Sequence, residues 1–183
     1  MPFLETPIKD LWLFEPRVFG DNRGYFYESF NQNEFTKATG VQSYFVQDNH
    51  SSSNYGVLRG LHFQKPPHSQ AKLIKVVKGK IWDVVVDLRS DKPTFGQHMG
   101  FELSAENQKQ LYVPQGFAHG FVVLSEVAEV LYKCDEFYAP KTESGIIYND
   151  STLNIDWKVK NDDLIISEKD ILLPAFDTLG KIF

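Results

Sequence analysis

From about Lys72 onward, the chain is dominated by short runs in which hydrophobic and polar residues alternate with a period near two. Alternation of this kind, broken by turn residues, is typical of half-buried β-strands. The runs cover Leu73 to Val77, Ile81 to Leu88, Gly96 to Leu103, Gln110 to Val113, Phe117 to Leu124 and Val127 to Phe137. The pair Lys78-Gly79 predicts a hairpin turn between the first two runs, because glycine tolerates positive φ. The pattern therefore favours an antiparallel sheet.

Helical signals are few. One predicted helix covers Asn33 to Thr39 and is closed by Gly40, and another covers Ser167 to Leu173 and is stopped by Pro174. The segment from Gln42 to Pro67 is less regular but rich in His, Asn, Arg and Gln, and we expect it to enter the mouth of a barrel. Many strands with little helix predict an all-β sandwich or barrel, and a cupin-like jelly roll suits the length.

The composition narrows the class of protein. A chain of 183 residues with 42% hydrophobic content fits one domain, residues 1–183, better than two small ones. The net charge of -5 argues against broad nucleic-acid binding. No run approaches the roughly 18 apolar residues of a membrane helix. Cys134 is the only cysteine and the N-terminus lacks a basic region followed by an apolar run, so we expect a soluble, cytoplasmic protein.

Arg59 and His62 are the first candidates for chemistry. Because they are three residues apart, they would point to opposite faces of a regular strand, but Gly60 between them makes a bend possible. Histidine, with an ordinary pKa of about 6.5, takes and returns protons near neutral pH. A lone histidine is nevertheless more often a surface or core residue, so the pattern alone leaves its role open.

A metal site is not expected. Cupin-type barrels commonly hold a divalent ion with two histidines one residue apart, a later carboxylate and a further histidine. Here Gln64 stands where the second histidine would be, and His68 is too far displaced to restore the spacing. His119 does resemble the histidine of the second cupin motif, but a three-ligand set is missing.

Three other side chains have both a functional and an ordinary explanation. Lys72 opens an apolar strand, where lysines often only extend to solvent, and Tyr132 lies in a strand where tyrosines often fill the core. Asp170 fits the third residue of a capping box whose cap is Ser167.

Arg23 and Arg59 could together bind a diphosphate, since guanidinium groups match phosphate oxygens in pairs, although surface ion pairing explains both equally well. Tyr138 is either a stacking platform for a base or a strand-end aromatic residue.

Taken together, these segments resemble the dTDP-4-dehydrorhamnose 3,5-epimerase family along nearly the whole chain. The matching segments are Phe14 to Gly24, Glu28 to Asn31, Phe45 to Ser51, Gly56 to His62, Pro93 to Gly96, Leu103 to Asn107 and Val113 to Phe121. So many matches in one order are highly specific to this family.

The resemblance implies a jelly roll that works as a homodimer without a cofactor. It implies that His62 is the base, that Asp170 orients it, that Tyr132 is the acid on the opposite face, and that Lys72 stabilises the enolate oxygen. The substrate-binding positions that it implies are Arg23, Glu28, Gln47, Asn49, Arg59, Lys72, His119, Glu143 and Lys169, with Tyr138 stacking on the base. The implied substrate is dTDP-4-dehydro-6-deoxy-D-glucose, which is converted to dTDP-4-dehydro-L-rhamnose in dTDP-L-rhamnose biosynthesis.

The chemistry of such a substrate agrees with these roles. A ketone at C4 acidifies the hydrogens on C3 and C5, so one base can serve both carbons, and inversion needs a second proton donor across the ring. A cation near the C4 oxygen favours the charge that develops in the transition state. No hydride moves, and the sequence shows no Gly-rich dinucleotide fingerprint.

Other functions stay open at this point. The nearest are an epimerase that inverts only C3 or C5, and a 3,4-ketoisomerase of a nucleotide-linked 4-keto sugar. A metal-dependent cupin enzyme, suggested by His62, His68 and His119, and a sugar-nucleotide-binding module without catalysis are the more distant ones.

Overall fold

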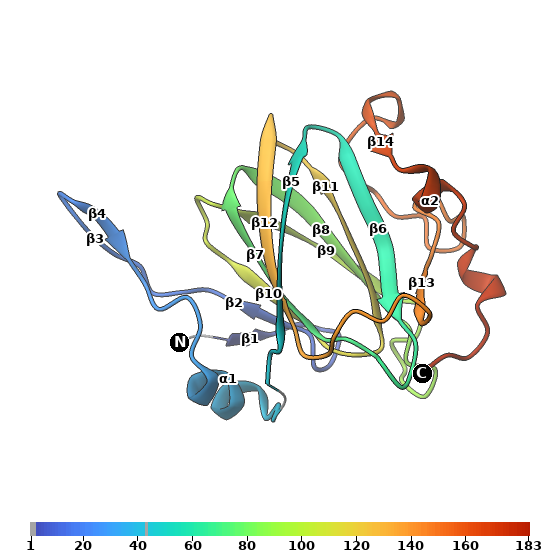
Figure 1. Ribbon diagram of the computed structural model, residues 1–183, viewed down its shortest axis with the longest axis horizontal. Coiled ribbons are helices and arrows are strands. Elements are labelled where there is room, and N and C mark those ends of the chain that lie inside the picture. Colours follow the sequence, from blue (N-terminus) through green and yellow to red (C-terminus); the bar gives the residue numbers. More distant parts are fainter. Residues whose placement is uncertain (1–2, 43) are drawn as a thin grey trace.

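Two facing β-sheets make up most of the protein, as a computed structural model of residues 3–42 and 44–183 shows (Figure 1). The first sheet has the order β1 (Phe3–Glu5), β2 (Trp12–Phe14), β10 (Gln110–Val113), β7 (Lys72–Lys78), β12 (Val127–Cys134) and β5 (Gln47–Asn54). The second has the order β13 (Glu143–Gly145), β6 (Val57–Gln64), β11 (Phe117–Val123), β8 (Lys80–Asp87) and β9 (His98–Ser104). A short strand, β14 (Ile165–Ile166), pairs in parallel with β6, and all other pairs are antiparallel. The expected all-β jelly roll is confirmed.

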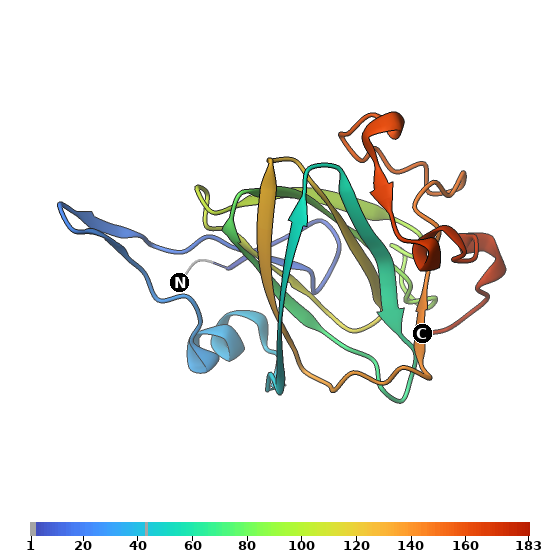
Figure 2. The same ribbon diagram turned by 45° about the horizontal axis from the view of Figure 1, so that its top comes forward.

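A two-stranded arm projects from this body. It consists of β3 (Phe19–Asp21) and β4 (Gly24–Phe26), and both views show it reaching away from the two sheets (Figures 1 and 2). Its aromatic residues Phe19, Tyr25 and Phe26 are exposed. The hydrophobic pattern did not predict this arm.

The helices are short. Helix α1 (Gln32–Thr39) begins after Asn31, whose side chain accepts hydrogen bonds from two backbone N–H groups, and ends at Gly40 in the left-handed conformation, as expected. Helix α2 (Glu168–Ile171) is shorter than expected and follows its N-cap Ser167. Two 3₁₀ turns complete the set, η1 (Asn161–Asp163) and η2 (Phe176–Thr178). None of the described helices has both the length and the apolar character needed to cross a membrane.

The predicted hairpin at Lys78-Gly79 is wrong. Each of the six predicted runs does contain a strand, but β7 and β8 lie in different sheets and do not pair with each other. Gly79 has the expected positive φ of 71°. A Cβ atom there would lie 2.0 Å from the carbonyl oxygen of Val127, so the glycine lets the chain pass close to β12 as it crosses between sheets.

The segment from Gln42 to Pro67 is more regular than predicted, because it forms the two eight-residue strands β5 and β6. On β5 the period of two is present, but polar residues occupy both faces. Gln47, Asn49 and Ser51 line cavities, while the residues between them are exposed. A strand that borders a polar cavity therefore lacks the apolar alternation by which strands are predicted.

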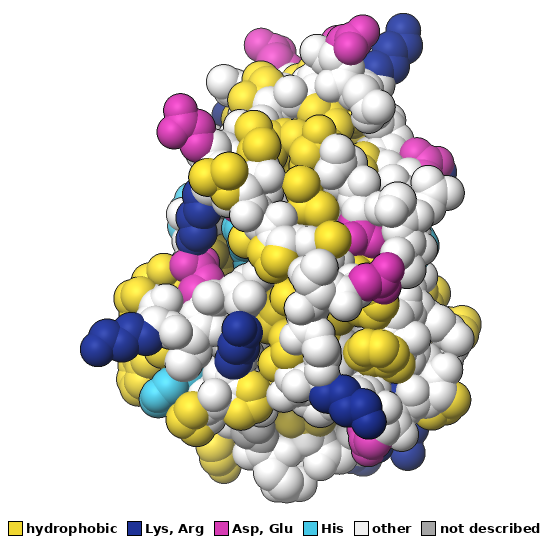
Figure 3. All heavy atoms as spheres, turned by 90° about the vertical axis from the view of Figure 1, so that its right-hand side faces the viewer, with side chains coloured by type: hydrophobic (Ala, Val, Ile, Leu, Met, Phe, Trp, Pro, Cys, Tyr) yellow, Lys and Arg dark blue, Asp and Glu magenta, His cyan; other side chains and the backbone are white. Residues whose placement is uncertain are grey.

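Two hydrophobic clusters hold the site in place. One fills the space between the sheets and includes Ile74 and Val76 of β7. The other covers the outer face of the second sheet and packs it against the C-terminal segment from Ile146 to Phe183. Seen from the side of this segment, the surface carries many hydrophobic side chains, with charged ones scattered among them (Figure 3). The inner row of β7 continues from Val76 and Ile74 to Lys72, so the row that packs the core ends in a functional candidate.

Candidate active site

A bulge in β6 brings Arg59 and His62 to the same face. In the pairing of β6 with β11, His62 lies opposite His119 and Arg59 opposite Phe121, so three residue steps on β6 match two on β11. Gly60, at the bulge, has a φ of 112°, and a Cβ atom there would lie 2.7 Å from the Cα of Gly120. The bend that Gly60 makes possible is therefore present.

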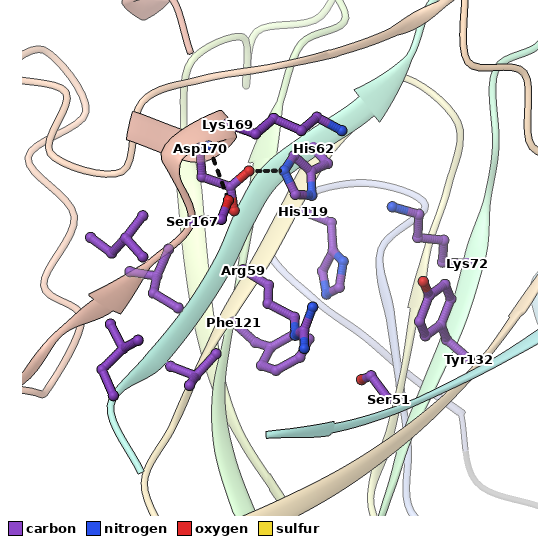
Figure 4. Close-up of a pocket in the computed structure, with 14 residues that line it drawn as sticks. Ser51, Arg59, His62, Lys72, His119, Phe121, Tyr132, Ser167, Lys169 and Asp170 are labelled. Atoms are coloured by element: carbon purple, nitrogen blue, oxygen red, sulfur yellow. Dashed lines mark hydrogen bonds and ion pairs between the residues drawn. The ribbon is translucent and has the colours of Figure 1, made fainter. Parts of the chain in front are cut away.

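The two sheets enclose a cavity of about 500 Å³. Arg59, His62, His119 and Phe121 line it from the second sheet, and Ser51, Lys72 and Tyr132 line it from the first. The segment carrying β14 and α2 closes a further side with Ser167, Lys169 and Asp170. Figure 4 shows His62 and Tyr132 on different walls of this one cavity, with the ammonium group of Lys72 pointing into the space between them.

His62 and Asp170 form a close pair although 108 residues separate them in the sequence. The Nε2 atom of His62 lies 2.6 Å from Oδ1 of Asp170, and Oδ2 accepts a hydrogen bond from the N–H of Gly60. Burial works to raise the pKa of Asp170, but the hydrogen bonds from His62, Gly60 and Ser167 outweigh it and hold that pKa below its usual value. The carboxylate is thus a charged partner for the imidazole.

The capping role proposed for Asp170 is only half of the explanation. Its N–H donates to Oγ of Ser167, as in an N-cap. Its carboxylate also pairs with His62 and accepts a hydrogen bond from the N–H of Gly60. The backbone of Asp170 therefore lies in the first turn of the helix, while its side chain holds His62 at the cavity.

Tyr132 and Lys72 face His62 from the opposite sheet. Burial raises the pKa of the Tyr132 phenol, so it is protonated well above neutral pH. Burial also lowers the pKa of the Lys72 ammonium group, with Cys134, Asp83 and Glu143 acting in the opposite direction. Neither side-chain polar atom takes part in a hydrogen bond or ion pair with the described residues, so both are available to a bound molecule.

A second imidazole–carboxylate pair lies on the same wall as His62. His119 Nε2 is 2.9 Å from Oδ2 of Asp83, whose side chain is fully buried. His119 is thereby fixed with one edge toward the carboxylate and lines the cavity.

An adjoining cavity of about 200 Å³ shares His62, Lys72 and Tyr132 with the first one. Its other lining residues include Gln47, Asn49, Tyr138 and Glu143. Tyr138 is 53% exposed and is held at the rim by the hydrogen bond from its N–H to Oε1 of Gln47.

Glu143 connects this rim to the segment that carries α2. Its Oε2 atom accepts hydrogen bonds from the Tyr138 hydroxyl at 2.9 Å and from Lys169 Nζ at 2.6 Å. Burial works to raise the pKa of Glu143, but these two donors keep it below its usual value. A charged network therefore spans the entrance between the two cavities.

Two predicted substrate-binding residues do not line either cavity within one chain. Arg23 lies on the arm, where its exposed side chain pairs with Asp21. Glu28 lies between the arm and α1 and accepts a hydrogen bond from Asn31.

Within residues 3–42 and 44–183, no three His, Cys, Asp or Glu side chains are grouped as metal ligands would be. His62 and His119 each direct Nε2 at a carboxylate, while His68 is exposed in a turn.

Several residues of the site were not predicted from the sequence. Ser51 and Phe121, and Ile165 and Ile166 of β14, line the cavity without any local signal, because hydroxyl and apolar side chains are common everywhere. Asp83 did carry a signal, since it is a carboxylate in the otherwise apolar run from Ile81 to Val86.

The jelly roll and this cavity, with an imidazole on one wall and a phenol on the other, suit an enzyme of the isomerase class. The family described as dTDP-4-dehydrorhamnose 3,5-epimerase matches residues 5–178. The chain belongs to the dTDP-4-dehydrorhamnose 3,5-epimerase family, as the sequence motifs indicated.

Similar proteins support this assignment across the full length. The dTDP-4-dehydrorhamnose 3,5-epimerase of Pseudomonas aeruginosa is 56% identical over 169 residues, which is 92% of either chain. The crystal structure of the enzyme of that name from Elizabethkingia anophelis has a TM-score of 0.95 and 55% identity, covering 100% of this chain and 99% of the other. The 3,5-epimerase from Legionella pneumophila, solved with dTDP-4-keto-L-rhamnose, has a TM-score of 0.93 and 44% identity, covering 97% and 94%.

Proposed function

We propose that this enzyme epimerises dTDP-4-dehydro-6-deoxy-D-glucose at C3 and C5 to dTDP-4-dehydro-L-rhamnose, in dTDP-L-rhamnose biosynthesis. The observation that carries the proposal is the placing of His62 and Tyr132 on opposite sheets around one cavity. A sugar ring held between these walls presents one face to the imidazole and the other to the phenol. That arrangement is what inversion of a carbon centre requires.

In each inversion His62 removes the proton on C3 or C5, and the electron pair of the C–H bond forms the enolate of the C4 ketone. Tyr132 then donates its proton to the same carbon from the opposite face, and the ketone is restored. His62 releases its proton to solvent and the Tyr132 phenolate takes one up, so the enzyme returns to its starting state. The raised pKa of Tyr132 supports its role as the acid, because it begins each cycle protonated.

The remaining side chains bind different parts of the substrate in the two cavities. Lys72 stabilises the oxygen of the enolate, because it lines the same cavity as Tyr132 and its ammonium group has no partner among the described residues. Arg59 and His119 bind the substrate from the wall that carries His62, and the guanidinium group of Arg59 is suited to the diphosphate. Gln47, Asn49 and Glu143, with Lys169, bind near the rim, where Tyr138 stacks on the base.

The test is exchange with solvent. The enzyme is incubated with dTDP-4-keto-6-deoxyglucose in deuterated water, and deuterium should appear at both C3 and C5. His62→Ala should abolish this exchange, and His68→Ala is the matched control because His68 is exposed and lines neither cavity.

Each rival function has its own outcome in the same experiment. Label at one carbon alone would assign the enzyme to the single-centre epimerases, and a shift of the ketone from C4 to C3 would make it a ketoisomerase. Activity that disappears with a chelator and returns with iron or manganese would favour a metal-dependent cupin enzyme. Binding without any exchange at high enzyme concentration would leave only a binding module.

We also propose that the enzyme works as a homodimer in which the arm completes the site of the partner. The exposed aromatic residues of β3 and β4 support this proposal, as does the place of Arg23 in an arm that reaches away from the two sheets (Figure 1) and lines neither cavity. A closed two-fold pair covers such an arm on both copies at once.

Sedimentation tests the dimer, and complementation tests the arm. Arg23→Ala and His62→Ala are each inactive or weakened alone, but a mixed dimer of the two has one site with both residues. Random exchange of equal amounts should restore about a quarter of the wild-type sites. A monomer in solution, or no recovery on mixing, would refute this arrangement.

A cytoplasmic location is proposed from the thiol. Cys134 is buried and free, so it calls for no oxidising compartment. Activity recovered in the soluble fraction of gently lysed cells, and absent from a periplasmic extract, is the expected result.

A further inference from the structure

Asp83 is a buried carboxylate behind the wall of the active site. It lies on β8 in a run of apolar residues, and its side chain is fully buried. On the paired strand β11, Asp83 lies opposite Phe121, so His119 is its diagonal neighbour on the inner face. Burial of a charged group is costly unless it is paired, so a carboxylate at this position needs a physical explanation.

Only half of this carboxylate is satisfied by the protein. Oδ2 lies 2.9 Å from Nε2 of His119, but Oδ1 is buried and has no hydrogen-bond partner among the described residues. A buried acceptor without a partner is destabilising, because it has lost its hydrogen bonds to water. The chain therefore keeps this carboxyl group beside the cavity at the expense of stability.

Lys72 is the cation without a partner on the other side of the same cavity. No hydrogen bond or ion pair with a described residue holds its ammonium group, and burial favours its neutral form. The charge of Asp83 favours the cationic form. The charged and titratable groups that face Lys72 from the surrounding elements are Cys134 and Tyr132 of β12, Asp83 of β8, His119 of β11, Arg59 and His62 of β6, and Glu143 of β13.

We propose that Asp83 is a positioning residue that fixes the ring of His119 through one oxygen and keeps the Lys72 ammonium group charged through the field of the carboxylate. This inference rests on the proposed epimerase reaction, in which Lys72 must be a cation when the enolate forms. Arg59 adds positive charge to the same wall, where the fully buried carboxyl group of Asp83 lies next to His119. Asp83 acts through these two side chains and touches no substrate.

The test is the pH profile of kcat/KM for Asp83→Asn, which keeps the size and removes the charge. Loss of the charge should move the alkaline limb to lower pH by about one unit or more, because Lys72 then loses its proton more readily. The shift should vanish in the Lys72→Arg background, since arginine stays charged throughout the range. Asp87→Asn is the matched control, because Asp87 is an equally buried carboxylate on β8 that pairs with Arg89.

An unshifted alkaline limb in folded Asp83→Asn, or the same shift in the Lys72→Arg background, would overturn the inference. Failure of wild-type enzyme to exchange label would instead overturn the proposed function, so the two failures are distinct. If Asp83→Asn does not fold, NMR of ¹³C-labelled lysine in the wild type, with Lys72→Arg for assignment, gives the charge state directly. A cationic Lys72 at pH 8 supports the inference and a neutral one refutes it.

Discussion

The strongest prediction concerns the pair of His62 and Asp170. Asp170→Asn keeps the size of the side chain but removes its charge, and the amide has only one oxygen that can accept a hydrogen bond. If that oxygen keeps the hydrogen bond from Gly60, the amide NH₂ faces Nε2 of His62. The imidazole must then carry its proton on Nδ1, which is the wrong tautomer for a base whose Nδ1 faces the substrate.

The size of the effect follows from the contact. The distance of 2.6 Å and the 4% exposure of Asp170 describe a hydrogen bond between a charged acceptor and a ring that becomes charged in the transition state. Such bonds contribute about 1.5–3 kcal/mol, which corresponds to a loss of roughly 10- to 150-fold in rate, and the tautomer adds to it.

The assay is the initial rate of deuterium incorporation at saturating substrate, with Asp156→Asn as control because that carboxylate pairs with Lys158 at the surface. The variant should bind substrate normally and lose kcat. A decrease of less than about threefold, with the protein folded, would refute the role of Asp170 as the partner of the base.

Three further predictions concern Tyr132 on the opposite wall, Gly60 at the bulge of β6, and the stability of the protein at low pH. Tyr132→Phe should still exchange label at the position that His62 deprotonates but should not complete inversion, and an equal loss of exchange and inversion would contradict separate roles. Gly60→Ala should lower the free energy of unfolding by about 2 kcal/mol or more, because its Cβ would meet backbone atoms and its φ is positive; thermal denaturation measures this, and an unchanged Tm would contradict it. Because the pKa of Asp170 is lowered on folding, its contribution to stability is present above its ordinary pKa near 3.9 and is lost as pH falls through the lower folded-state value. The difference in stability between wild type and Asp170→Asn should therefore shrink between about pH 5 and pH 2, and a constant difference in urea titrations would count against it.

The sequence predicted best where one face of a strand is apolar. The runs from Leu73 to Phe137 show their strands because residues such as Ile74, Val76 and Val130 form an apolar row that packs the core. The strands on either side of Gly79 were predicted but not which strand each pairs with, since pairing depends on contacts far away in the chain. The strand β5 and the arm were missed because neither has an apolar row facing a core.

The resemblance implied which side chains act together, but no local pattern in the sequence places them together. The motifs named His62, Lys72 and Tyr132, yet only the fold shows that they meet in one cavity from two sheets. The partnership of Asp170 with His62 spans 108 residues and has no local pattern beyond the helix cap. Asp83 is recognisable in the sequence as a carboxylate in an apolar run, but its partner His119 is 36 residues away.

The hydrophobic cluster between the sheets also acts as a spacer. The proposed base and acid lie on different sheets, so the gap that must admit a sugar ring is set by the bulk of residues such as Ile74, Val85 and Val130, which do not line the cavity. Trimming one of these side chains lets the walls approach, and enlarging one pushes them apart. The stereochemistry of the product thus depends on aliphatic packing between the sheets, because this packing sets the spacing of the two walls.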